Sequence, residues 1–352
     1  MSEALQSLGH RVDDAASSVL DDWRRRALLF EQEVGRAVVG QDRAIRLLTI
    51  AIFSRGHVLL EGDVGVGKTT LLRATARAMG GVFERIEGTI DLMPSDLIYH
   101  TYLAEDGRPR VEPGPVLKSG EDLAIFFFNE INRARPQVHS LLLRLMAERS
   151  LTAFNREYYF PDLIVMADRN RVEREETFEL PAAARDRFLM EVGIAAPADN
   201  DVRRALAFDP RFHDVDQLIE SVREGVLDHR RIAQVARQIQ ADVHASPALE
   251  TYVLNLWRAF RYPQEAGIRM EGVEMERLVY AGASPRGISA LVRAARVAAW
   301  MQGRSMVVPE DVRSVFAETM SHRLFLNTLY ELRRDQLMPE LIAALFDTVP
   351  AP

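Results

Sequence analysis

The sequence predicts an α/β fold, in which a parallel sheet carries helices on both faces, followed by a smaller all-helical domain. Three observations predict this fold. Short, almost continuously apolar runs alternate with helical patterns from about residue 35 to residue 195, as in parallel strands that are buried on both faces. A glycine-rich loop motif follows the first of these runs, at residues 62–69. After Pro197 the apolar runs end and helical periodicity dominates.

The order of these patterns divides the chain into three parts. Residues 1–34 are expected to form an amphipathic helical extension, in which Asp21 or Asp22 caps a helical segment. Residues 35–197 form the α/β core, and residues 198–352 form the helical domain and the C-terminal helices. The expected strands of the core are Val58–Leu60, Val82–Ile86, Ile125–Phe128, Leu163–Ala167 and Met190–Ile194.

Two stretches interrupt the alternation of strand and helix in the core. An insert over residues 88–116 contains a helix start at Pro94 and a hairpin-turn pair, Asp106-Gly107. A second hairpin is expected over residues 151–161. In this hairpin, residues 152–154 would pair with residues 158–160 across the loop Asn155-Arg156-Glu157.

The composition excludes several classes of protein. No apolar run reaches the roughly 18 to 20 residues that cross a bilayer, so no membrane insertion is expected. The formal net charge of −7 argues against a broad basic surface for nucleic acid. Cysteine is absent, which excludes disulfides and thiolate metal sites and fits a protein of the reducing cytoplasm.

The loop motif predicts a nucleotide-binding site. The pattern G-x-x-x-x-G-K-[ST] lets consecutive backbone N–H groups point at phosphates, and the helix that follows adds its N-terminus. Lys68 would reach the β- and γ-phosphates of ATP, and the Thr69 hydroxyl would bind Mg²⁺. The expected nucleotide-binding residues of this loop are Gly62, Asp63, Val64, Gly65, Val66, Gly67, Lys68, Thr69 and Thr70.

A second motif, Asn129-Glu130, follows the third apolar run. In nucleoside triphosphatases the first of these positions usually holds Asp, which is linked to Mg²⁺, and the Glu activates the attacking water. Asn129 can still accept a hydrogen bond from a metal-bound water, but it carries no negative charge. We therefore expect a weakened metal contact at Asn129 and water activation by Glu130.

These motifs, in this order, resemble those of the MoxR family of AAA+ ATPases, in the helix-2-insert branch. The resemblance spans about residues 35 to 325 and includes the loop, the run Phe128–Ala134, Asn170, Asp186-Arg187-Phe188 and Ser284-Pro285-Arg286. It implies an AAA+ core with a variant Walker B motif at Asn129, a helical lid, and a ring that usually has six subunits. The stretches 88–116 and 151–161 would then be the helix-2 insert and the pre-sensor hairpin, which face the central pore.

The resemblance also implies roles for residues outside the loop. Asn170 takes the place of the sensor-1 Asn, which holds the attacking water or the γ-phosphate. Arg187 takes the place of the finger arginine, which reaches the nucleotide of the neighbouring subunit. Arg286 takes the place of the sensor-2 arginine of the lid, which couples the nucleotide state to the lid angle. Gly40-Gln41 resembles the segment that lines the adenine pocket.

Several positions depart from the family pattern. Asn129 replaces Asp, Asp168 and Arg171 stand where the family usually has Thr and Pro, and residues 175–177 also differ. The residues needed for hydrolysis remain. The first hypothesis is therefore an ATP-hydrolysing ring with a weakened metal site that remodels or activates a client protein, as relatives do with a partner carrying a von Willebrand factor A domain. The alternative is a nucleotide-binding assembly module that hydrolyses little or no ATP.

Overall fold

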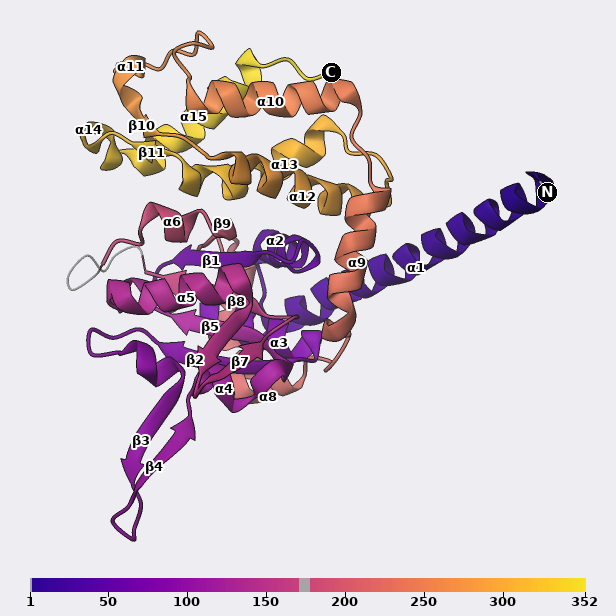
Figure 1. The fold of residues 1–352 in the computed structure, drawn as a ribbon. Coiled ribbons are helices and arrows are strands. Elements are labelled where there is room, and N and C mark those ends of the chain that lie inside the picture. The colour runs from indigo at the N-terminus through magenta and orange to yellow at the C-terminus, as the bar shows by residue number, and fades with distance from the viewer. Residues whose placement is uncertain (1, 171–177) are drawn as a thin grey trace.

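A five-stranded sheet forms the centre of the core (Figure 1). The computed structural model describes residues 2–170 and 178–352, with side chains from residue 19 onward. The strand order is β2-β5-β8-β1-β9, and every neighbouring pair is parallel. The five expected strands are confirmed, with ends that move by two residues or fewer. They are β1 (His57–Gly62), β2 (Val82–Glu87), β5 (Leu123–Asn129), β8 (Ile164–Arg169) and β9 (Phe188–Ile194).

Both faces of the sheet are buried, because successive side chains of a strand point to opposite faces. Leu59, Phe126 and Val165 belong to a hydrophobic cluster that includes residues of α5. On the other face, Phe127 and Met166 belong to a larger cluster that continues through α1, α2 and α3 into the helical domain. The helices that cover the sheet are α1 (Ser2–Ala37), α2 (Asp42–Phe53), α3 (Lys68–Met79) and α5 (Pro136–Glu148).

The N-terminal helix α1 packs on the core along its second half. Trp23 and Phe30 are fully buried there, and the Trp23 ring lies edge-on to Phe53 with 6.3 Å between ring centroids. The first half of α1 projects away from the rest of the molecule (Figure 1). The expectation that Asp21 or Asp22 caps a helix is wrong, since the helix runs unbroken through both residues. Each instead forms ion pairs with arginines one turn later.

The insert between β2 and β5 carries a hairpin that projects from the sheet (Figure 1). The short helix η1 begins at Pro94, and Gly107 lies in the hairpin turn with a φ of +74°, as the sequence predicted. Leu103 and Val111 of this hairpin are exposed. The elements of the insert are η1 (Pro94–Leu97), β3 (Tyr99–Leu103), β4 (Pro109–Pro113) and α4 (Pro115–Lys118).

The second hairpin forms with a different turn from the expected one. Strand β6 (Ser150–Ala153) pairs with β7 (Arg156–Tyr159) in a register that places Thr152 opposite Glu157. The turn holds only Phe154 and Asn155, whose φ angles are +52° and +58°. Two-residue hairpin turns of this kind match the right-handed twist of the strands, so the chain pairs two residues that the sequence assigned to the loop.

The part of the chain after Pro197 is mainly helical, and its C-terminal helices form a layer beside the core (Figure 1). The expectation that strands end at Pro197 is wrong in one detail. Strands β10 (Val279–Ala281) and β11 (Phe325–Leu326) form a small antiparallel pair, too short to show an alternating pattern. The helices are α7 (Asn200–Phe208), α8 (Val215–Glu220), α9 (His229–Asp242), α10 (Pro247–Arg261), α11 (Met275–Leu278), α12 (Pro285–Met301), α13 (Pro309–Met320), α14 (Thr328–Glu331) and α15 (Arg334–Thr348). Within the described residues, no helix is both long and apolar enough to cross a membrane.

Candidate functional site

The glycine-rich loop joins β1 to α3 at the carboxyl end of the sheet. Gly65 and Gly67 have φ angles of +81° and +88°, values that L side chains rarely adopt. Gly62 is required for a different reason, because a Cβ at this position would lie 2.3 Å from the carbonyl oxygen of Ile194. Lys68, the residue after Gly67, begins α3. The loop therefore places its backbone and a helix N-terminus at one point, which suits an anionic group.

Lys68 is held at this point by three oxygen-bearing groups. Its side chain is only 8% exposed, and Nζ donates to the carbonyl oxygen of Gly62 at 2.8 Å and to Oδ1 of Asn170. Nζ also lies 3.4 Å from Oδ2 of Asp168. The phosphate oxygens of a nucleotide could accept hydrogen bonds from Nζ in the same way as these three oxygens. The ammonium group is thus already directed into the space beside the loop.

Asn170 connects Lys68 to Glu130. Its amide donates through Nδ2 to Oε1 of Glu130 at 3.2 Å, while Oε2 of Glu130 lies 3.1 Å from Nε of Arg133. Glu130 itself has a φ of +53°, an uncommon value for a residue other than glycine. Its backbone N–H donates to Oδ1 of Asp168 at 2.6 Å, which fixes this turn. Lys68, Asn170 and Glu130, predicted from separate motifs, lie in one chain of contacts.

Asp168 is a residue of this site to which the sequence assigned no role. Its side chain is 1% exposed, and a buried carboxylate is unfavourable unless it is paired. Burial raises the pKa of Asp168, and the Glu130 N–H and the Lys68 charge oppose that rise. The signal that could have identified it is its position, since a carboxylate at the carboxyl end of a parallel strand faces the ligand edge of such a sheet.

The donors near the loop fit Mg²⁺ only as a companion of a nucleotide. In the described part of the chain, no group of three or more His, Asp or Glu side chains could hold a metal alone. Mg²⁺ usually binds one or two carboxylates together with phosphate oxygens and water. Thr69, the second residue of α3, and Asn129, the last residue of β5, are the expected metal contacts. Asn129 is half-buried, and its carbonyl oxygen accepts from Gly88 N at 2.7 Å.

A cavity of about 560 Å³ adjoins the loop, in the region where the resemblance implies an adenine pocket. Gln41 lines it and is fixed there, because its Nε2 donates to the carbonyl oxygen of Ala195 at 2.7 Å. Gly40 does not line the cavity but turns the chain into it, with a φ of +76°. Apolar side chains and loop atoms make up most of the wall, notably Val38, Val64, Val66, Thr70, Leu206 and Phe212.

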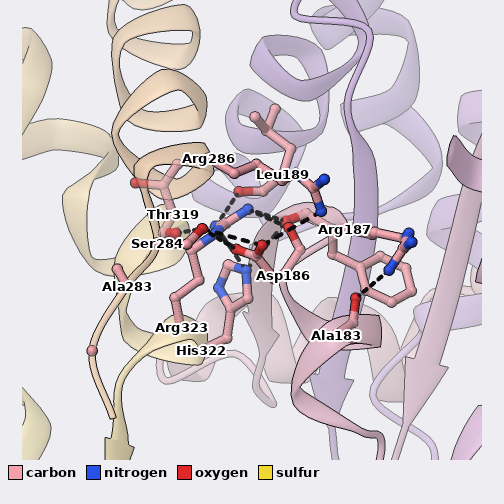
Figure 2. Close-up of polar contacts among 12 residues, drawn as sticks. Ala183, Asp186, Arg187, Leu189, Ala283, Ser284, Arg286, Thr319, His322 and Arg323 are labelled. Carbon is pink, nitrogen blue, oxygen red and sulfur yellow. Dashed lines mark hydrogen bonds and ion pairs between the residues drawn. The ribbon is translucent and has the colours of Figure 1, made fainter.

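Arg187 lies near the amino ends of the strands, whereas Lys68 lies beyond their carboxyl ends. It immediately precedes β9, whose first residue, Phe188, pairs with His57 at the start of β1. The loop begins five residues later along β1, so Arg187 and the loop are separated by roughly 16 Å of strand. Arg187 donates to the carbonyl oxygen of Ala183 at 2.8 Å (Figure 2), while its Nε is buried without a hydrogen-bond partner. Among the described residues, no carboxylate forms an ion pair with it.

Arg286 lies beside Arg187 rather than beside Lys68. At the start of α12 its guanidinium is 3.5 Å from Asp186, and its side chain is 59% exposed. The resemblance implied that Arg286 reports from the lid on the nucleotide. The lid packs against the amino-terminal end of the sheet and brings Arg286 there (Figure 2). The role that the resemblance implies for Arg286 stays a prediction.

Arg323 holds the lid against this end of the sheet. It is 2% exposed and pairs with Asp186 at 3.0 Å, and it donates to the carbonyl oxygens of Phe188 at 2.6 Å and Leu189 at 3.2 Å. Burial lowers the pKa of Arg323 to about 10, and Asp186 opposes this shift. Arg323 could not be identified from the sequence, because its role depends on contacts between residues more than 130 positions apart.

The end of the sheet that contains Arg187 has a strong excess of positive charge. A cavity of about 330 Å³ opens there between core and lid, and Asp186 is the one acidic residue among the described residues that line it. Burial, followed by the charge of Arg55, lowers the pKa of Arg293, so these guanidinium groups affect one another. The arginines that line the cavity are Arg55, Arg149, Arg187, Arg286, Arg293 and Arg323. Among the described residues, Asp186 alone balances this positive charge, so such a cavity suits an anion.

The remaining departures noted in the sequence, Arg171 and residues 175–177, lie outside the described residues.

Comparison with known proteins agrees with this fold. A model of the ATPase family associated with various cellular activities (AAA) matches residues 57–190, and an AAA lid domain model matches residues 275–342. Protein MoxR of Methylorubrum extorquens is 68% identical over 335 residues, covering 95% of this chain and 98% of that protein. Chaperone MoxR1 of Mycobacterium tuberculosis is 34% identical, covering 88% of this chain and 78% of that protein. A crystal structure of a candidate ATPase from Cytophaga hutchinsonii has a TM-score of 0.83 at 29% identity, covering 98% of this chain and 99% of that chain.

Proposed function

The chain belongs to the MoxR family of AAA ATPases, and from this premise we propose that it hydrolyses ATP in a closed ring and remodels or activates a client protein. One observation carries the proposal. Residues suited to bind and activate ATP lie at the carboxyl ends of the strands, while Arg187 and Arg286 lie at the amino ends. The two sets cannot meet on one nucleotide within a chain, but they can meet between two copies arranged head to tail.

The proposed division of labour follows from the side chains. The loop and Lys68 hold the phosphates, and Glu130 takes the proton of the attacking water while Asn170 positions it. Mg²⁺, when bound with ATP, neutralises charge on the β- and γ-phosphates. Arg187 of the next subunit enters the site and offsets the charge that develops on the transferred phosphoryl group. Arg286, exposed beside Arg187, would act on the same neighbouring nucleotide.

The further features of the proposal come from the family resemblance. We propose a ring of six subunits of the helix-2-insert branch, in which the β3–β4 hairpin and the β6–β7 hairpin face the central pore. The exposed Leu103 and Val111 would then contact the client. The client, or a partner that presents it, would include a protein with a von Willebrand factor A domain.

A mixing experiment tests the shared site. Glu130→Gln removes the general base and Arg187→Ala removes the finger, and each variant alone should lose at least about 100-fold in ATPase rate. Mixed in equal amounts, the two should recover about a quarter of the wild-type rate, because one interface in four then pairs an intact Glu130 with an intact Arg187. Mass photometry with ATP confirms that rings form in each sample.

Two results would count against the proposal. If mixed rings assemble without any recovery of activity, then Arg187 does not complete a neighbour's site. If the wild type is no faster than Glu130→Gln, the chain is not an active ATPase, and the nucleotide-binding assembly module becomes the better description.

A further inference from the structure

Two departures from the family pattern, Asn129 and Asp168, lie side by side near the phosphate loop. Phe128 pairs with Ala167 in the parallel ladder of β5 and β8, so the next residues along the two strands are Asn129 and Asp168. Asp168 also pairs with Leu60 of β1, the strand that leads into the phosphate loop. The sheet therefore has a neutral amide at the end of β5 and a carboxylate at the end of β8, one strand closer to the loop.

Asp168 has the properties required of a carboxylate that works at the phosphates. It is buried, and its Oδ2 lies 3.4 Å from the Lys68 ammonium. In the described part of the chain, no other carboxylate forms an ion pair with Lys68. Its second oxygen, Oδ1, accepts the backbone N–H of Glu130 at 2.6 Å, so the carboxylate has a fixed orientation. Glu130, the other acid nearby, is engaged by Asn170 and Arg133.

We propose that Asp168 supplies the negative charge for the Mg²⁺ that accompanies ATP, in place of the carboxylate missing at Asn129. With ATP bound, the phosphates would draw Lys68 away from Asp168, and the Asp168 oxygen that contacts Lys68 would then be free to hold the Mg²⁺ that accompanies the nucleotide. Thr69 and the neutral Asn129 complete the protein's donors. The site then has the same total charge as one that follows the family pattern, because a carboxylate on β8 replaces the carboxylate that the family has on β5. This inference rests on the proposed ATP site but on neither the ring nor hydrolysis.

A swap of the two side chains tests the proposal. The four proteins are the wild type, Asp168→Asn, Asn129→Asp and the double variant. The affinity for a non-hydrolysable ATP analogue is measured by calorimetry with Mg²⁺ and with EDTA, and Mn²⁺ bound in the presence of the analogue is counted by electron paramagnetic resonance. Glu87→Gln is the matched control, because it removes one exposed carboxylate from the end of the next strand, β2.

Asp168→Asn should reduce the gain in analogue affinity that Mg²⁺ provides by about 10- to 100-fold, as is typical when a supporting ligand of a metal is lost. The double variant should regain most of that loss, and Glu87→Gln should resemble the wild type. Asn129→Asp alone should change the Mg²⁺ dependence little, because Asp168 already provides the charge. This last variant keeps the test decisive if Asp168→Asn fails to fold.

Other outcomes would overturn the inference. If Asp168→Asn weakens binding equally with Mg²⁺ and with EDTA, then Asp168 only positions Lys68. A large gain in Mg²⁺ dependence from Asn129→Asp alone would show that the metal lacks its carboxylate in the wild type. If the double variant folds but does not regain the Mg²⁺ dependence of analogue affinity, the proposed exchange of the two carboxylate positions would also be wrong. If the wild type binds no analogue at all, the proposed ATP site fails first, and this inference with it.

Discussion

Two arginines contact the same carboxylate, and we predict that they differ sharply in what they contribute to stability. Replacing Arg323 by Met should lower the free energy of unfolding by about 3–5 kcal/mol, the usual range for removing one partner of a buried ion pair. Replacing Arg286 by Ala should lower it by less than about 1 kcal/mol, as for an exposed pair. Both contact Asp186, at 3.0 Å and 3.5 Å respectively.

The difference follows from burial and from the number of partners. Arg323 is 2% exposed and also donates to the backbone carbonyl oxygens of Asp186, Phe188 and Leu189, at 3.1, 2.6 and 3.2 Å. Methionine would remove a donor from each of these carbonyl oxygens, and Phe188 would keep only the contact with Nε2 of His322 at 3.2 Å. Each acceptor left buried without a donor costs about 1–3 kcal/mol. Arg286 is 59% exposed and makes a single, longer contact, so water replaces most of what the guanidinium provided.

Urea unfolding followed by circular dichroism measures both values, and Asp186→Asn completes a double-mutant cycle with each arginine. We expect a coupling energy of about 1–3 kcal/mol between Arg323 and Asp186 and a value near zero between Arg286 and Asp186. Equal losses for the two arginines would refute the reasoning. So would a loss below about 1 kcal/mol for Arg323→Met.

Three further predictions concern other parts of the chain. Burial lowers the pKa of His57 to about 3 in the folded protein, whereas the same side chain in the unfolded chain has a pKa near 6.5. Because the unfolded state then binds the proton first, the free energy of unfolding should fall as the pH drops below about 6.5. This group contributes up to about 1.4 kcal/mol for each pH unit. His57→Gln should flatten this part of a melting-temperature profile, and an unchanged slope would contradict it. Gly62→Ala should lower stability by about 1–3 kcal/mol in urea unfolding, because its Cβ would meet the Ile194 carbonyl oxygen at 2.3 Å; a neutral result would show that β9 yields easily. Trp23→Ala should reduce the free energy of unfolding by about 3–5 kcal/mol, because Trp23 is buried against Phe53. Val19→Ala is the control, because Val19 is 40% exposed. Equal losses for the two variants would mean that α1 is not part of the core.

The strands were predictable from the sequence because each is a short apolar run buried on both faces. The run that ends at Phe128 illustrates this, since every residue from Leu123 to Phe128 is buried. The phosphate loop was predictable because its chemistry demands particular residues at fixed spacing. The chain of contacts from Lys68 through Asn170 to Glu130 follows from the same logic, as all three residues come at or just beyond the carboxyl ends of neighbouring strands.

Features that depend on distant segments were not predictable. The position of Arg286 depends on how the lid packs, and that packing depends on Arg323, whose partners come from the start of β9. The turn at Phe154-Asn155 was misplaced because phenylalanine rarely adopts a positive φ, and only the pairing of β6 with β7 imposes one. From the sequence alone, Asp168 is only a departure from a motif, because its contact with Lys68 appears only when β8 lies beside β1.

The attachment of Arg323 to Asp186 has a mechanical consequence. Asp186 and Arg187 are adjacent in the chain, so the residue that anchors the lid is directly bonded to the residue proposed to enter the neighbour's site. A rotation of the lid would therefore act as a lever on Arg187. In the proposed ring, this coupling would transmit a change in one subunit's lid to the ATP of the next subunit, always in the same direction around the ring.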